Sequence, residues 1–142
     1  MPYKYLEDVA TADAAFEATG GTLESLFSEC AKACTEIMAN TKSIKQKIKK
    51  TIRIKSDIVE NLLFDFLGEL LFIKDTKKLL FSRFDVKIAE KNGKMTMTAV
   101  LHGEKIDIKR HGIKTDIKAV TLYKFSVKKT KDEWKAVVVV DI

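Results

Sequence analysis

Apolar residues recur with a period of about 3.6 positions in two stretches of the chain, and this spacing predicts two helices. The first stretch is Leu23–Met38, with Thr22 standing where an N-cap is expected. A capping box made by Asp57 and Glu60 is expected to begin the second helix, which continues to about Ile73. The apolar face of that helix is very wide, so we expect it to be packed on most of its sides.

Alternating or β-branched segments predict six strands, and two of the connections between them carry the residues of tight hairpins. The pair Asn92-Gly93 is the strongest short hairpin signal, and residues 130–133 form the second turn. The order of elements predicts an α+β fold: a single domain over residues 1–142, with two helices packed on a mostly antiparallel sheet of six to seven strands. The predicted strands cover residues 13–18, 50–55, 79–88, 95–101, 119–128 and 134–141.

Composition is ordinary for a soluble globular protein, with 46% hydrophobic and 32% charged residues. No apolar run reaches the roughly 20 residues that a membrane-spanning helix needs. The first five residues lack the apolar stretch of a signal peptide. We therefore expect a cytoplasmic protein that has no membrane partner.

The whole chain has a net charge of +6, and the positive charge is concentrated in its second half. Residues 1–73 hold nine basic and eleven acidic side chains, whereas residues 74–142 hold seventeen and nine. This asymmetry favours an acidic partner for the second half, either nucleic acid or an acidic protein surface. The alternative is that the scattered lysines form a solvated face.

The two cysteines, Cys30 and Cys34, lie four residues apart on the apolar face of the first predicted helix. We interpret them as small core residues. A redox pair is the alternative, and it would need exposed thiols with a lowered pKa.

Two isolated carboxylates stand in apolar surroundings near opposite ends of the chain. Asp13 begins a segment of small residues, and Asp141 ends a run of four valines just before Ile142. Burying a carboxylate is costly unless a cation or several donors meet it, so we predict that the two ends come together. Their oxygens, with those of Ile142, suit Ca²⁺, Mg²⁺ or Mn²⁺. The alternative is that Asp13 caps a turn and Asp141 lies in solvent.

Histidine, arginine and lysine gather in residues 102–121, where they could hold a phosphate or position a carboxylate. From this group we predict His111 and Lys118 as residues that contact a partner. Lys118 precedes an apolar pair and is expected to be partly buried, hence partnered. An exposed basic loop is the alternative.

Asp65 and Glu69 share one face of the second helix and could act as acid and base or bind a metal. The alternative is that they form the polar stripe of an otherwise buried helix. The chain lacks the glycine-rich phosphate loop, the paired Cys-x-x-Cys, Gly-x-Ser-x-Gly and His-Glu-x-x-His. Enzyme classes that depend on these local motifs are therefore not indicated.

Six short motifs, in order along nearly the whole chain, resemble those of the archease family. None is diagnostic alone, but six in one order over a single domain form a specific pattern. The motifs are Thr-Ala-Asp at 11–13, Gly-x-Thr-Leu-Glu-x-Leu-Phe beginning at Gly20 or Gly21, Leu-Leu-Phe-Asp-Phe-Leu-Gly-Glu-Leu-Leu at 62–71, Leu-Leu-Phe-Ser at 79–82, His-x-Ile-Lys-Thr-Asp-Ile-Lys-Ala-Val-Thr at 111–121 and a closing Asp-Ile.

The resemblance implies a small cytosolic accessory protein, not itself an enzyme, for the tRNA-splicing RNA ligase that uses GTP and Mn²⁺. Such a protein would promote guanylylation and multiple turnover of the ligase. The resemblance also implies a chaperone-like link to tRNA or to a tRNA methyltransferase. It implies a divalent metal, often calcium, held by Asp13, Asp141 and Ile142, and a functional role for Lys118.

One departure from the family pattern precedes the first aspartate. Many relatives read Glu-His-Thr-Ala-Asp, whereas here Asp8, Val9 and Ala10 separate Glu7 from Thr11. The histidine is missing, and Asp8 is a candidate for an alternative oxygen ligand.

Overall fold

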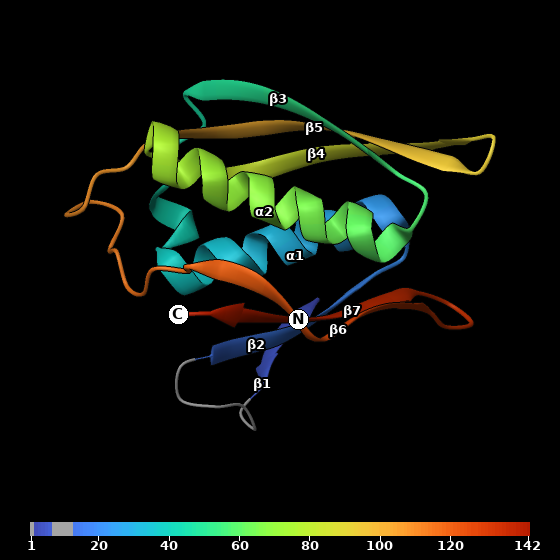
Figure 1. Ribbon diagram of the computed structural model, residues 1–142. Helices are drawn as coiled ribbons and strands as arrows, with labels where there is room; N and C mark the ends of the chain where they lie inside the picture. The colour runs from blue at the N-terminus through green and yellow to red at the C-terminus, as the bar shows by residue number, and fades with distance from the viewer. Residues whose placement is uncertain (1, 7–12) are drawn as a thin grey trace.

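Two helices lie between two antiparallel sheets (Figure 1), as a computed structural model shows for residues 2–6 and 13–142. The strands are β1 (Tyr3–Leu6), β2 (Asp13–Gly20), β3 (Ile48–Ser56), β4 (Leu79–Lys91), β5 (Lys94–Lys105), β6 (Ala119–Lys129) and β7 (Trp134–Asp141), and the helices are α1 (Leu23–Met38), α2 (Val59–Lys77) and a short 3₁₀ turn at Thr41–Ser43.

The seven strands of the described chain form two separate sheets. The lower sheet in Figure 1 has the order β1-β2-β7-β6, and the upper sheet has the order β3-β5-β4. The predicted α+β class, with two helices and antiparallel strands, is confirmed. The strands are divided between two sheets because each helix has apolar residues to bury on more than one side.

Helix α1 begins as the sequence predicts. The Thr22 hydroxyl accepts a hydrogen bond from the Ser25 amide at 3.1 Å, and the Ser25 hydroxyl accepts one from the Thr22 amide at 3.1 Å. Cys30 and Cys34 are buried in the core, as predicted. Burial raises the pKa of Cys34 to about 12 and that of Cys30 well above its ordinary value, which is the opposite of what a redox pair needs.

Helix α2 crosses the middle of the molecule and contacts strands of both sheets, which accounts for its wide apolar face. The predicted capping box is wrong. The N-cap residue is Ile58, which makes no side-chain capping bond, and the Ser56 hydroxyl instead accepts from the Ile58 amide at 3.2 Å. At the other end the helix stops at Lys78, whose φ of 57° is left-handed.

The Asn92-Gly93 hairpin is confirmed, with φ values of 54° and 76° at the two turn residues. Strand β1, which the sequence pattern did not reveal, pairs with β2 at the edge of the lower sheet. It is only four residues long, and Lys4 and Tyr5 are both exposed, so it carries no clean alternation of apolar and polar residues.

No helix in the described part of the chain is long and apolar enough to cross a membrane.

Strands β4 and β5 approach each other very closely at Gly103. The pairing shifts register at Ser82, and a Cβ atom added to Gly103 would lie only 1.9 Å from the carbonyl oxygen of Leu80. Any side chain at this position would therefore push the two strands apart, just where the chain leaves the sheet for the loop after β5.

We therefore expect Gly103→Ala to lower the free energy of unfolding by about 3 kcal/mol, the upper part of the range for overpacking a tight site. The matched control is Gly68→Ala in α2, where an added Cβ meets nothing within 4 Å. That change should raise stability by about 0.5–1 kcal/mol, because alanine is the better helix former. Urea denaturation followed by circular dichroism measures both, and equal effects would contradict the steric argument.

Candidate functional site

Asp13 and Asp141 lie directly opposite each other at one end of the lower sheet. They are the terminal register partners of the antiparallel pair β2 and β7. Directly opposed residues have Cβ atoms about 4.5–5.5 Å apart and project from the same face of the sheet. The prediction that the two ends of the chain meet is confirmed, and Figure 1 shows the C-terminal end of β7 beside the start of β2.

Buried apolar pairs fix this register. Phe16 lies opposite Val138, and Ala14 lies opposite Val140. Phe16, Val138 and Val140 are completely buried and belong to the core that the helices share with this sheet. A slip of one residue would move this apolar set to the outer face, so the register is strongly specified. Since side chains alternate along a strand, Asp141 projects away from the helices.

Strand β6 brings Lys118 to the same end of the sheet. The Lys118 amide donates a hydrogen bond to the Asp141 carbonyl oxygen at 2.8 Å, and Ala119 pairs with Asp141. The expected partial burial of the Lys118 side chain is wrong, because Ile117 takes the buried position and Lys118 follows it into solvent. The exposed ammonium is thus free to reach a partner.

Among the residues that the structure describes, no neighbouring cation neutralises either carboxylate. Within residues 2–6 and 13–142, Asp13 and Asp141 form no ion pair, and no third His, Cys, Asp or Glu side chain joins them in a metal-holding group. Like charges placed directly opposite each other on a sheet repel. Two carboxylates at this spacing provide hard oxygen donors that fit a divalent cation such as Ca²⁺, Mg²⁺ or Mn²⁺. The suggested extra ligand Asp8 lies outside the described residues.

His111 is a structural residue and cannot touch a partner directly, which corrects its predicted role. Its ring is fully buried. Nδ1 accepts a hydrogen bond from the Asp107 amide at 2.9 Å, so Nε2 carries the proton that it donates to a Glu104 carboxylate oxygen 2.9 Å away. Both ring nitrogens are therefore occupied inside the protein.

Glu104 is the centre of this buried cluster. Besides His111, its carboxylate accepts hydrogen bonds from Arg110, at 2.7 Å, and from the Lys45 amide, at 2.6 Å. The Arg110 guanidinium holds the pKa of Glu104 well below its usual range, with His111 and the Lys45 amide adding to the effect. The cluster fastens the beginning of the loop at residues 106–118 to the body of the protein.

A second cluster, centred on the buried Lys74, fastens the end of the same loop. Lys74 is only 6% exposed, and its ammonium contacts the exposed Asp116 carboxylate and donates a hydrogen bond to the Ile117 carbonyl oxygen at 3.2 Å. Sequence reasoning missed Lys74, although it continues the apolar spacing of Leu67 and Leu71 in α2. A lysine in a core position of a helix was the available signal, since a buried ammonium needs a partner.

These two clusters determine where Lys118 lies. The loop holds no regular element, yet both of its ends are tied to buried charged groups, so the chain enters β6 at a defined place. Beside this entry a groove of about 350 Å³ runs between α2 and β6, and Lys118, Phe72 and Val120 are among its lining residues. Phe72 is 59% exposed there.

The structure favours the polar-stripe interpretation of the helix carboxylates. Asp65 is exposed and Glu69 is half-buried, and in the part of the chain that the structure describes neither forms an ion pair. His111, which would have to join these carboxylates in a hydrolytic site, is buried and bonded to Glu104.

We expect Glu104→Gln to destabilise the protein by about 2–3 kcal/mol at pH 7, since it leaves the Arg110 and His111 donors competing for one amide oxygen. Because the folded-state pKa lies below the ordinary 4.5, this stabilisation is complete above that pH and is lost as the pH falls toward the lower folded value. Urea titrations between neutral and acidic pH should therefore show that the difference in unfolding free energy between the variant and wild type becomes smaller as the pH falls. Glu133→Gln, in the exposed turn before β7, is the control and should change little; a gap that persists in strong acid would contradict the argument.

Comparison with known proteins places the whole chain in one family. The sequence matches the Archease protein family over residues 3–142. It is 42% identical to the protein archease of Methanosarcina barkeri, covering 99% of this chain and 95% of that protein. It is 35% identical to the protein archease of Pyrococcus furiosus, covering 93% and 94%.

Two solved structures share the fold. The solution structure of protein 1598 from Methanobacterium thermoautotrophicum superposes with a TM-score of 0.88 at 35% identity, covering 99% of both chains. A crystal structure from Thermotoga maritima, described as an archease and possible chaperone, gives a TM-score of 0.62 at 22% identity, covering 94% of this chain and 93% of that chain, and supports the fold alone. The family match, the identities and the shared architecture agree, and the chain belongs to the archease family.

Proposed function

We propose that this protein is a non-catalytic, cytoplasmic accessory protein that activates a tRNA-splicing RNA ligase through an acidic tip. The acidic tip consists of Asp13, Asp141 and Ile142, with Lys118 beside it. The observation that carries the proposal is the register of β2 and β7, which sets two carboxylates face to face while the Lys118 amide bonds to the Asp141 carbonyl. Membership of the archease family supports the identity of the partner.

The tip supplies charge and position but lacks a complete catalytic set. The described residues around it offer carboxylates and one ammonium, and His111 is buried away from them. Positioning and electrostatic stabilisation are the main requirements of phosphoryl-transfer sites, including those that transfer a nucleotide. An accessory protein can improve such a site by ordering charged groups in it without making or breaking a bond itself.

A divalent cation, which we propose to be Ca²⁺ with Mg²⁺ and Mn²⁺ as alternatives, would be held by the side chains of Asp13 and Asp141 and a main-chain oxygen of Ile142. The cation would relieve the repulsion between the carboxylates and present positive charge at the tip. Family resemblance is the source of this assignment, and the opposed carboxylates fit it.

The groove between α2 and β6 gives the partner a place to dock next to the tip. Its lining includes the apolar side chains of Phe64, Leu71 and Phe72, while Lys118 stands at its border. An apolar surface flanked by a charged group is typical of protein interfaces, in which the centre is apolar and the rim polar.

The test is multiple-turnover joining, by the purified ligase, of an RNA with a 3′-phosphate to one with a 5′-hydroxyl. Wild-type protein should increase turnover, and Asp141→Asn should reduce that increase by about tenfold or more, the loss seen even when only the outer shell of a metal ligand is disturbed. Asp132→Asn, in an exposed turn, is the charge-matched control and should stimulate like wild type. Equal stimulation by Asp141→Asn and wild type would refute the proposal.

Thermal unfolding tests the cation separately. In chelator, Asp141→Asn should be more stable than wild type by about 0.2–1 kcal/mol, because it removes the repulsion between opposed charges. With Ca²⁺ at about 100 times its dissociation constant, wild type should gain about 2.7 kcal/mol and the variant should gain far less. Titrations with Mg²⁺ and Mn²⁺ rank the three metals by the stabilisation that each gives. If none of the three stabilises the wild-type protein against thermal unfolding, the protein has no such site.

The second candidate is a general tRNA-binding or chaperone-like modulator of an RNA-modifying enzyme such as a tRNA methyltransferase. Its support is the net charge of +6 and the description of the Thermotoga maritima protein as a possible chaperone. Stimulation of such an enzyme, together with no effect on the ligase, would favour it over the first proposal.

A further inference from the structure

The outer face of the β3-β5-β4 sheet, which points away from the helices, carries a dense set of cations. Side chains alternate along each strand, and the pairing of β3 with β5 runs without a register shift from Ile48 to Ser56. The inward positions of β3 include the apolar Ile52 and Ile54. The outward positions are Lys49, Thr51, Arg53 and Lys55 on β3, Thr96, Thr98, Val100 and His102 on β5, and Arg83, Asp85, Lys87 and Ala89 on β4.

These outward side chains form two basic edges with a neutral floor between them. The cations lie on the two outer strands, and the central strand contributes threonine, valine and histidine. Register places Lys49 and Arg83 on either side of His102, and Arg53 and Lys87 on either side of Thr98. Neighbouring strands are about 4.8 Å apart, so the two basic edges are separated by roughly 10 Å. We call this surface the basic trough.

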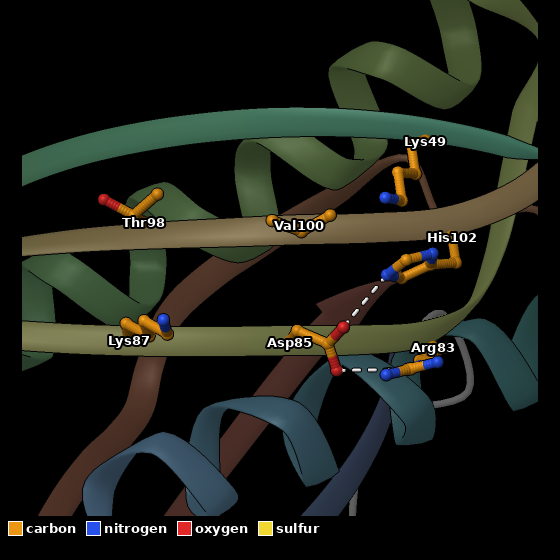
Figure 2. Close-up of a pocket in the computed structure, with 7 residues that line it drawn as sticks. All are labelled: Lys49, Arg83, Asp85, Lys87, Thr98, Val100 and His102. Carbon is orange, nitrogen blue, oxygen red and sulfur yellow. Dashed lines mark hydrogen bonds and ion pairs between the residues drawn. The ribbon is translucent and has the colours of Figure 1, made fainter.

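Figure 2 shows the basic trough from outside, with Lys49, Arg83, Lys87 and His102 projecting from the strands and the helices behind them. The hollow has a volume of about 600 Å³. Its lining comes from all three strands of the sheet, and the outward cations of β3 continue beyond it to Arg53 and Lys55, so the surface as a whole suits an extended chain.

The single carboxylate of the basic trough is already paired. Asp85 lies 3.1 Å from the Arg83 guanidinium and 2.9 Å from Nε2 of His102. By contrast, Lys49, Arg53 and Lys87 form no ion pair with any group in the described ranges 2–6 and 13–142, and the same holds for Lys55. Four cations are thus available to an anionic ligand.

From this arrangement we propose that the basic trough binds the phosphodiester backbone of a single RNA strand. Unpaired cations stand on both sides of the trough, three on β3 and Lys87 on β4, and they match a chain that bears one negative charge per nucleotide. The hydroxyls of Thr51, Thr96 and Thr98 can donate to phosphate oxygens or to ribose. The trough has no Phe, Tyr or Trp on which bases could stack, and its one imidazole, that of His102, is largely buried and bonded to Asp85, so we expect binding to be independent of sequence.

An acidic protein fits this surface less well. Protein interfaces have an apolar centre depleted of charge, often with aromatic residues. The basic trough has the opposite character, since only Val100 and Ala89 among its outward residues are apolar. The inference does not depend on the acidic tip, which lies on the other sheet.

The test is fluorescence anisotropy of a short labelled single-stranded RNA of mixed sequence, titrated with the full chain. The variant replaces Lys49, Arg53 and Lys87 with glutamine. The control replaces Lys109, Lys128 and Lys131, which are exposed and lie outside the trough, so that both proteins lose the same net charge. Thermal unfolding confirms that both variants fold, which is expected because every replaced side chain is exposed.

We expect the trough variant to bind RNA at least about tenfold more weakly at low salt. Between about 50 and 200 mM salt, its slope of log affinity against log salt should be shallower by about 2, since each phosphate contact with a single strand contributes about 0.7. The control should keep the wild-type slope. Equal losses in the two variants would overturn the proposal, as would displacement of the RNA by polyglutamate or anionic vesicles as efficiently as by unlabelled RNA.

This outcome is separable from the proposed ligase activation. The binding assay contains no ligase and does not use Asp141, so its failure would leave the acidic tip untouched. Conversely, the effect of the Asp141 variant on ligase stimulation does not bear on RNA binding at the trough, which the anisotropy assay measures separately.

Discussion

The pairing of β2 with β7 is the constraint on which the rest of the candidate site depends. Buried pairs such as Phe16 and Val138 hold the two strands in one register, and that register forces Asp13 and Asp141 together at the end. Repulsion between two opposed carboxylates costs less than about 1 kcal/mol, whereas exposing a large apolar side chain costs about 1.5–3 kcal/mol. Packing of the core therefore determines the geometry, even though it places the two carboxylates opposite each other.

Buried charge positions the other half of the site. The connection from β5 to β6 has no regular structure of its own, so it lacks the continuous main-chain pairing of a strand and makes isolated main-chain hydrogen bonds, such as those of His111 with Asn40 and of Lys114 with Met38. Glu104 with His111, and Lys74 with Asp116, replace that pairing at its two ends. Removing a partner of buried Glu104 or of buried Lys74 leaves that buried group less satisfied, which makes such clusters sensitive to substitution. Lys118 is consequently placed partly by these charged clusters and partly by the hydrogen bond from its amide to the Asp141 carbonyl oxygen.

Periodicity was sufficient to predict the helices and most strands, and the cost of burying two isolated carboxylates predicted the meeting of Asp13 with Asp141, because these features follow from which side chains must be buried. It failed where a contact joins segments that no local pattern connects. His111 has the same side chain whether it lies in a solvated loop or bonds to Glu104, and only the fold distinguishes the two cases. The division of the strands into two sheets could not be predicted for the same reason. The wide apolar face of α2 shows that other elements cover the helix, but it does not show whether they belong to one sheet or to two.

The layered architecture also keeps the two charged surfaces apart. The acidic tip projects from the outer side of one sheet and the basic trough from the outer side of the other, with the helices between them (Figure 1). A helix with its side chains is about 10–12 Å thick, and the Debye length at physiological ionic strength is about 8 Å. Both surfaces face solvent on opposite sides of the molecule and are farther apart than this layer, and exposed charges separated by more than a Debye length are largely screened by the surrounding salt. An RNA strand in the trough would therefore leave the carboxylates at the tip available for a cation, and each surface can be altered without changing the electrostatics of the other.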